Sequence, residues 1–151
     1  MKVKVKVFNK SKNELPSYAT AGSAGIDLVA NINGIDRQII YPGKWALVHT
    51  GLHVAIPEGY ELQIRPRSGL ALKKGITVLN SPGTIDCDFR GEVGVIVINH
   101  SDEAIAFANG DKVAQAVLKQ VDQIEWESVS TFEQLPTTDR GEGGFGSTDK
   151  K

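Results

Sequence analysis

Two aspartates, Asp86 and Asp88, stand close together in the segment Asn80–Val93, which reads NSPGTIDCDFRGEV. Residues two apart in an extended chain point to the same face, so the two carboxylates would lie side by side. Neighbouring carboxylates repel, so one holds its proton more tightly, or one binds a water while the other binds an arginine such as Arg90. The ordinary alternative is a surface hairpin in which an aspartate pairs with Arg90. Cys87 lies between the acids, whose negative charge disfavours the thiolate that a cysteine nucleophile needs.

A second segment, Arg65–Ala71 (RPRSGLA), places two arginines and a serine where a predicted strand gives way to a helix. Backbone N–H groups are free at a helix start and the helix dipole favours negative charge there, so this segment is a candidate anion site. Pro66 disfavours a helical Arg65, so the helix begins after it. The alternative is an ordinary helix start, with Ser68 as the N-cap and both arginines solvated.

The C-terminal segment Arg140–Thr148 (RGEGGFGST) combines glycines with an arginine, an aromatic ring and two hydroxyl groups. Glycines let successive backbone N–H groups converge on an anion, and the arginine adds charge. Ser147 and Thr148 add donors and Phe145 offers a flat face, so the combination suggests a nucleotide. The spacing formally matches a dinucleotide-binding fingerprint, but only five residues follow Gly146, too few for the helix that this fingerprint requires. The alternative is a disordered terminus.

Further candidates are less distinctive on their own. Asp27 follows a glycine-rich bend in the segment SAGIDL, and Gln115 ends the segment FANGDKVAQ on a predicted strand. His49 and His53 are four residues apart, a spacing that separates two side chains by ~13 Å on a strand. Thr50 stands where a helical zinc motif needs glutamate, so the histidines are not predicted to bind zinc.

Strand patterns recur along the chain and must position these residues. The opening residues alternate lysine with valine, the period-2 pattern of a strand with one wet face and one dry face. Similar patterns cover residues 45–56, 60–64, 77–79, 92–98, 104–107 and 112–118. Asn109 and Gly110 predict a type I′ hairpin between the last two strands. Only Ser68–Lys74 reads as a helix, so we predict an all-β sandwich or barrel with one short helix.

The composition changes near Pro136. A chain of 151 residues is long enough for one self-sufficient core, and residues 1–136 are predicted to form one β-barrel domain. Residues 137–151 hold a single apolar side chain, Phe145, among Gly, Thr, Ser and charged residues. Such a segment cannot bury enough surface to order itself, so it is either an unused terminus or an arm that folds onto another surface.

Charge and cysteine content exclude several functions. The formal net charge is -1 and the pI is about 6.3, unlike the basic footprint of a nucleic-acid binder, so nucleic acid is not predicted as a partner. No apolar run nears the roughly 18 residues of a membrane helix, so no membrane association is predicted. The chain has one cysteine and no signal-peptide pattern, so we expect a soluble protein in the cytoplasm, with nuclear, organellar or viral origin left open.

Taken in order, the segments SAGIDL, RPRSGLA, NSPGTIDCDFRGEV, FANGDKVAQ and RGEGGFGST resemble the five motifs of the trimeric dUTPase family. The resemblance spans residues 23–148. It implies a jelly-roll-like β-barrel with one short helix and a flexible C-terminal arm. It also implies a homotrimer with shared active sites, in which the glycine-rich arm, residues 137–151, closes over a neighbouring subunit's active site.

The resemblance assigns roles to individual residues. It implies that Asp86 orients and deprotonates the attacking water and that Asp27 supports the arrangement near the metal. The residues implied to bind substrate are Arg67, Ser68, Gly69 and Gln115 at the triphosphate, Asn80, Gly83, Thr84 and Ile85 at uracil, Phe89 at the deoxyribose, and Arg140, Phe145, Gly146, Ser147 and Thr148 from the arm. Phe89 stands where many members have tyrosine, so the ring is kept and its hydroxyl is lost. The implied cofactor is Mg²⁺, held mainly by the triphosphate and waters rather than by protein ligands.

The implied activity is hydrolysis of dUTP to dUMP and pyrophosphate by in-line attack of water on the α-phosphorus. This reaction lowers dUTP, prevents uracil incorporation into DNA and supplies dUMP for dTMP synthesis. Two alternatives share the fold: a dCTP deaminase-like enzyme, and a regulatory protein that binds dUTP without turning it over. Deaminases lack a stacking phenylalanine in such an arm and use a glutamate base, neither of which fits this sequence. A β-barrel scaffold without chemistry is a third alternative.

Overall fold

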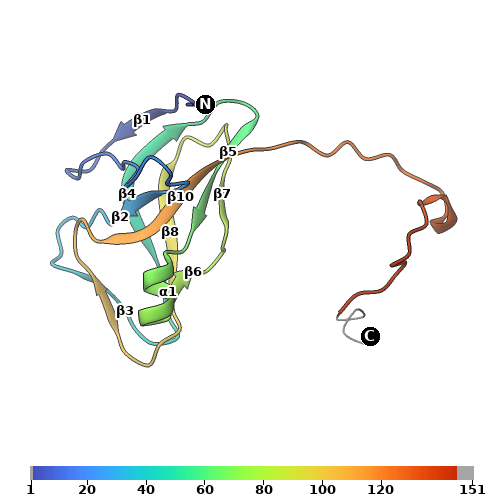
Figure 1. Cartoon of the computed structure of the whole chain (residues 1–151). Coiled ribbons are helices and arrows are strands. Elements are labelled where there is room, and N and C mark those ends of the chain that lie inside the picture. Colours follow the sequence, from blue (N-terminus) through green and yellow to red (C-terminus); the bar gives the residue numbers. More distant parts are fainter. Residues whose placement is uncertain (1, 146–151) are drawn as a thin grey trace.

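Two four-stranded antiparallel sheets make up the body of the computed structural model, which describes residues 2–145 (Figure 1). The first sheet has the order β1 (Lys6–Asn9), β4 (Trp45–Ala55), β8 (Glu92–Asn99), β6 (Ile76–Val78). The second has the order β2 (Ile26–Val29), β10 (Lys112–Gln120), β5 (Tyr60–Arg65), β7 (Gly83–Ile85). A small third sheet pairs β3 (Gln38–Ile40) with β9 (Ile105–Phe107). The predicted all-β fold class is confirmed, although these sheets form a sandwich rather than a closed barrel.

The core lies between the two large sheets. Strand β8 contributes Val93, Val95 and Val97, every second residue, as the period of a strand requires. Leu28 of β2 and Ile64 of β5 face them from the second sheet, and all five side chains are almost fully buried. Burial of side chains of this size contributes about 1.5–3 kcal/mol each, so this interior fixes the sheets that carry the candidate site.

The loop at Asn109 and Gly110 is not the predicted hairpin. Strand β9 pairs with β3, whereas β10 pairs with β2 and β5, so the two flanking strands belong to different sheets. Gly110 has a φ of 85°, but Asn109 lacks the positive φ of a type I′ turn. The Asn109 side chain instead accepts a hydrogen bond from the backbone N–H of Ile32, at 3.0 Å. A long-range bond therefore fixes a conformation that local turn preferences do not predict.

Helix α1 (Ser68–Lys74) begins one residue earlier than a Ser68 N-cap would require. Arg67 is the N-cap, with φ -91° and ψ 129°, and no side chain makes a capping hydrogen bond. Ser68 is therefore the first helical residue, and the prediction of its capping role was wrong. The helix ends at Gly75, whose φ of 61° suits glycine, and β6 follows at once.

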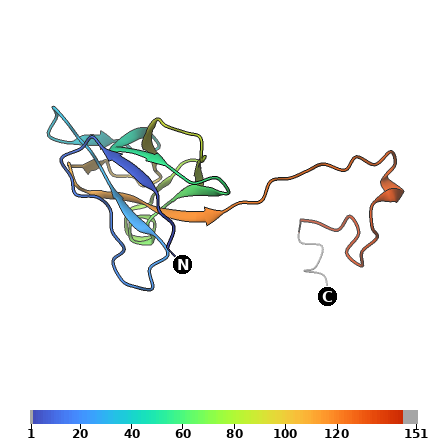
Figure 2. The ribbon, with the colours of Figure 1, turned by 90° about the horizontal axis from the view of Figure 1, so that it is seen from above.

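The chain leaves the body after β10. Residues 121–142 are all exposed, and Figures 1 and 2 show this segment running away from the sheets, with one short 3-10 turn, η1 (Phe132–Gln134). Apolar side chains in it, such as Ile124 and Trp126, are 73% and 83% exposed. The exposed segment thus begins well before residue 137, where the sequence analysis placed the start of the arm. Nowhere in residues 2–145 does a helix have the length and apolar character needed to cross a membrane.

Candidate active site

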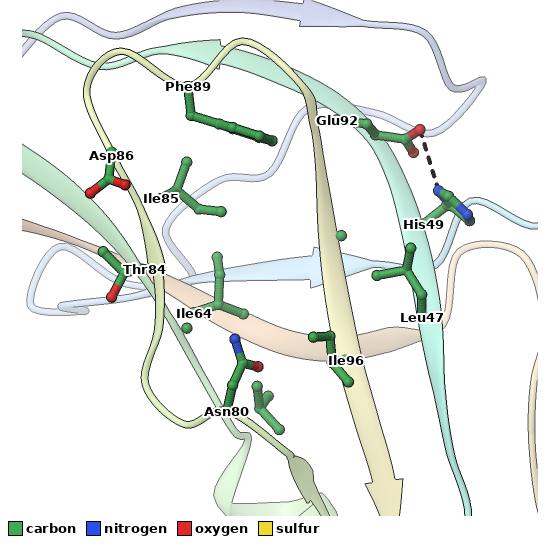
Figure 3. A pocket seen from close by; sticks show the side chains of 13 residues that line it. Leu47, His49, Ile64, Asn80, Thr84, Ile85, Asp86, Phe89, Glu92 and Ile96 are labelled. Carbon is green, nitrogen blue, oxygen red and sulfur yellow. Dashed lines mark ion pairs between the residues drawn. The ribbon is translucent and has the colours of Figure 1, made fainter.

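A cavity of about 310 Å³ lies between strands β4 and β8 and the segment that carries Asp86 (Figure 3). Apolar side chains form much of its wall: Leu47, Ile64, Val78, Ile85 and Ile96. The polar groups are few. They include the amide of Asn80, which points into the cavity in Figure 3, and the carboxylate of Asp86 at the outer edge. An apolar cavity with a few polar groups is typical of a small-molecule site.

Pairing between β5 and β7 builds one wall of this cavity. Gly83 lies opposite Ile64 and Ile85 lies opposite Leu62, and Asp86 follows directly after β7. Gly83 is buried, and a Cβ placed on it would come within 3.3 Å of the Ile64 Cβ and 3.4 Å of the Asn80 amide nitrogen. A larger residue would therefore narrow the cavity beside that amide. The structure thus brings together the residues predicted at uracil and the deoxyribose, Asn80, Gly83, Thr84, Ile85 and Phe89, with the predicted base Asp86.

The loop after Asp86 is a turn rather than an extended segment. The Phe89 N–H donates to the Asp86 carbonyl oxygen at 3.2 Å, so Asp86 and Asp88 do not share one face of a strand as predicted. Arg90 does not pair with either aspartate. Its Nη1 donates to the backbone carbonyls of Cys87 and Phe89, at 2.7 and 2.8 Å. Arg90 therefore holds the turn in shape, and the carboxylate of Asp86 stays exposed.

The Phe89 ring lies across Gly91 at the top of the cavity (Figure 3). A Cβ on Gly91 would overlap the ring, whose Cε2 would be 2.9 Å away. The ring is 41% exposed in the single chain. Because Gly91 has no side chain, the Phe89 ring can occupy this space.

His49 and Glu92 line the same cavity and were not among the predicted site residues. His49 Nδ1 lies 3.3 Å from one carboxylate oxygen of Glu92, and the backbone N–H of Gly51 donates to the other at 2.7 Å. The pairing of β4 with β8 shifts register between His49 and His53, with Gly51 at a φ of 73°. Such an irregularity redirects side chains. No local sequence pattern predicts this register shift, so the contact between His49 and Glu92 could not be predicted from their spacing.

A second polar cluster surrounds Asp27 on β2, the edge strand opposite β7 in the second sheet. Arg67 Nε lies 2.9 Å from Asp27 Oδ1, and Lys112 Nζ lies 2.8 Å from Asp27 Oδ2. Burial by itself raises the pKa of Asp27, but the hydrogen bonds and positive charges of Lys112 and Arg67 together hold this pKa below its usual value. Asp27 is therefore an ionised carboxylate between two cations.

Gln115 belongs to this second cluster. It lies opposite Asp27 on one side and Arg65 on the other, and its Nε2 donates to the Pro66 carbonyl oxygen at 2.9 Å. Ser68 and Gly69 lie exposed in the first turn of α1, next to Arg67. The residues of the domain that were predicted to bind the triphosphate are thus gathered in one place.

The two clusters are separated within one chain. Ile85 lies opposite Leu62, and the five residue steps from Leu62 to Arg67 span about 17 Å at the usual rise of a strand. Residues 137–145 of the arm are also distant from both clusters (Figures 1 and 2). Arg140 Nε donates to the carbonyl oxygen of Gly143, three residues later, at 2.7 Å, and Phe145 is fully exposed. Gly146, Ser147 and Thr148 lie outside the described residues.

Comparison with known proteins identifies the family. Residues 11–149 match the family model described as dUTPase. The chain belongs to the dUTPase family. It is 52% identical over 149 residues to the deoxyuridine 5'-triphosphate nucleotidohydrolase of Fusobacterium nucleatum, and the match covers 99% of each chain. The resemblance recognised in the sequence motifs is thereby confirmed.

Solved dUTPase structures have the same fold. A mutant dUTPase of Staphylococcus bacteriophage 80alpha with dUpNHpp superposes with a TM-score of 0.81 at 24% identity, over 96% of this chain and 98% of that one. A mutant dUTPase from phage phi11 of S. aureus, described with a structural Mg(II) ion, superposes with a TM-score of 0.73 at 23% identity, over 87% and 99%. At these identities the likeness concerns the fold, and it supports the jelly-roll-like architecture expected of a dUTPase.

Proposed function

We propose that this member of the dUTPase family hydrolyses dUTP to dUMP and pyrophosphate, which lowers dUTP and supplies dUMP. The observation that carries the proposal is the cavity that places Asn80, Phe89 and an edge strand beside the exposed carboxylate of Asp86. The cavity volume of about 310 Å³ lies at the lower end of the range for small-molecule sites.

Uracil is recognised by the edge strand and by Asn80. Strand β7 is the last strand of its sheet, so the backbone groups on its outer side have no neighbouring strand and are free to pair with a base. In this proposal the backbone of Thr84, Ile85 and Asp86 pairs with O4 and N3–H of uracil. Cytosine presents the reverse pattern and would leave buried groups unpaired, which is a strong form of rejection. The Phe89 ring packs on the deoxyribose and excludes a 2′-hydroxyl.

Asp86 is the catalytic base in this proposal. Its carboxylate accepts a proton from a water as the water oxygen attacks the α-phosphorus. The bond from that phosphorus to the oxygen bridging the α and β phosphates breaks in line, and pyrophosphate leaves with that oxygen. Asp86 is suited to this role because it is exposed at the cavity edge and Arg90 is engaged with backbone carbonyls instead.

The complete site is shared between copies of the chain, which we propose form a homotrimer. Asp86 and Arg67 lie too far apart in one chain to act on one triphosphate, so Arg67, Ser68, Gly69 and Gln115 of one copy serve Asp86 of another. The exposed apolar residues after β10 support this assembly, since no residue in the described range 2–145 covers them: Ile124, Trp126, Val129, Phe132 and Leu135. Residues 137–151 then act as the arm of the domain formed by residues 1–136, with Arg140 and Gly146–Thr148 over the phosphates and Phe145 on uracil.

The residues present fit Mg²⁺ held mainly by the substrate. Within residues 2–145 no cluster of three or more His, Cys, Asp or Glu side chains is arranged to bind a metal ion, which is compatible with an ion held by the triphosphate oxygens and by waters. Bound Mg²⁺ would neutralise charge that grows on the leaving pyrophosphate. We propose that the reaction takes place in the cytoplasm.

The test is incubation of the purified protein with dUTP, dCTP, dTTP and UTP separately in Mg²⁺, followed by chromatographic separation of the products. Conversion of dUTP alone to dUMP and pyrophosphate is the expected result. Deamination of dCTP would instead support the deaminase-like alternative. Binding of dUTP with no product would refute the hydrolase proposal and leave the regulatory alternative.

A further inference from the structure

We propose that Lys112 is a positioning residue for substrate binding: it holds the Asp27 carboxylate, and through it the Arg67 guanidinium, in the geometry that binds the triphosphate. The proposal rests on the proposed function, because it places Arg67 at the triphosphate. Lys112 does not itself need to touch the substrate. Its effect passes through Asp27.

The geometry of the three side chains supports this chain of contacts. Lys112 Nζ and Arg67 Nε bind different oxygens of Asp27, at 2.8 and 2.9 Å. Arg67 uses Nε for this contact, and its terminal Nη groups make no hydrogen bond to the described residues 2–145. Two parallel N–H donors are the arrangement that binds a phosphate oxygen pair. The three side chains together carry a net charge of +1, which favours an anionic ligand.

A β-bulge turns Lys112 toward Asp27. Lys112 lies opposite Val29 and Ala114 lies opposite Leu28, so β10 has one residue more than β2 at this point. In a regular strand Lys112 and Gln115, three apart, would point to opposite faces. The extra residue reverses this, and Lys112 lies on the face that carries Asp27 and Gln115. The backbone irregularity is thus what brings the lysine to the cluster.

Partial burial makes Asp27 dependent on both cations. The Asp27 side chain is 28% exposed and that of Arg67 is 31% exposed, so neither is fully solvated. Burial acts to raise the pKa of Asp27, and Lys112 and Arg67 offset it. Glu14 lines the same cavity of about 320 Å³ as Asp27 and Lys112, and its negative charge cannot replace the lysine. Without Lys112, Asp27 binds a proton at a higher pH and then loses its ion pair with Arg67.

The test compares Lys112→Met, which removes the charge but keeps most of the length of the side chain, with Lys112→Arg, which keeps the charge. Lys119→Met is the matched control, because Lys119 is an exposed lysine on the same strand. For Lys112→Met we expect the KM for dUTP to rise about tenfold with kcat changed less than about twofold. Lys112→Arg should restore most of the affinity, and Lys119→Met should match the unaltered protein.

The pH dependence separates positioning from a purely structural role. Ionised Asp27 is needed for binding and is lost as pH falls through its pKa, so the acid limb of kcat/KM should move to higher pH in Lys112→Met. An unchanged KM and an unchanged acid limb would overturn the proposal, as would failure of Lys112→Arg to rescue. If the unaltered protein does not hydrolyse dUTP, the proposed function fails instead. Carboxyl NMR titration of Asp27 then still decides the contact with Lys112, because an unchanged pKa in Lys112→Met refutes it.

Discussion

Replacement of Gly91 by alanine should change sugar selectivity without unfolding the protein. The new Cβ would overlap the Phe89 ring, and the end of a flexible side chain is the part that yields. Gly91 has no positive φ, so its backbone accepts alanine. Alanine also lowers the entropy of the unfolded chain, a gain of about 0.4–1 kcal/mol. We therefore expect the ring to move away while the melting temperature changes by only a few degrees.

The size of the effect follows from the contact that is lost. Phe89 is 41% exposed in the single chain, so one face of its ring is available to cover the deoxyribose. Loss of roughly 50 Å² of apolar contact at about 25 cal/mol per Å² costs about 1.3 kcal/mol, which is close to tenfold in kcat/KM for dUTP. The barrier to a 2′-hydroxyl weakens at the same time. The ratio of kcat/KM for dUTP over UTP should therefore fall by about tenfold or more.

The assay measures pyrophosphate release from dUTP and from UTP for Gly91→Ala, Phe89→Leu and the double variant. Gly22→Ala is the control, because a Cβ at Gly22 meets no atom within 4 Å. In the Phe89→Leu background, Gly91→Ala should have little further effect on the ratio, because the ring that it displaces is already gone. A normal dUTP/UTP ratio in the folded Gly91→Ala variant would refute the role given to the ring.

Other changes test separate parts of the molecule. Asp86→Asn should bind dUTP almost normally and lose turnover by roughly a thousandfold; retention of more than a tenth of the activity would show that the base lies elsewhere. Truncation after Leu135 should leave a folded protein with little activity, and mixing it with Asp86→Asn subunits should restore some turnover if sites are shared. Asn99→Leu should lower the free energy of unfolding by about 2–4 kcal/mol, because the buried amide of Asn99 binds the carbonyls of Ile40 and Glu103. Asp27 has a lowered pKa, so its ionised form stabilises the fold above the pKa of the unfolded chain, and this stabilisation is lost as pH falls through the folded pKa. Urea unfolding at a series of pH values should therefore show a weaker acid dependence in Asp27→Asn.

Local patterns in the sequence predicted most strands. The strand patterns at residues 45–56 and 92–98 match β4 (Trp45–Ala55) and β8 (Glu92–Asn99) closely, because in a strand with one buried face every second residue is apolar. Strands β2 (Ile26–Val29), β3 (Gln38–Ile40) and β7 (Gly83–Ile85) were missed. They have only three or four residues each, too few for a period to show, and each is held in place by pairing with another strand.

The candidate site was predicted as separate segments rather than as a geometry. The residues of the motif around Asp86 line one wall of the cavity together, because they are neighbours in sequence. His49 and Lys112 reach their sites through irregular strand registers, which depend on pairing across the sheet. Arg90 is an arginine near two acids, yet it binds backbone carbonyls. Spacing alone cannot distinguish these outcomes.

The separation of Asp86 from Arg67 within one chain bears on how the rate responds to dilution. A catalyst complete in each molecule loses rate in proportion to its concentration. Asp86 lies beside the start of β5, whereas Arg67 follows the end of that strand as the N-cap of α1, so under the proposed shared site an isolated molecule would lack part of the site. The proposed shared site therefore predicts that the rate falls more steeply than the protein concentration once dilution separates the copies, so that the concentration of the protein sets the activity per copy.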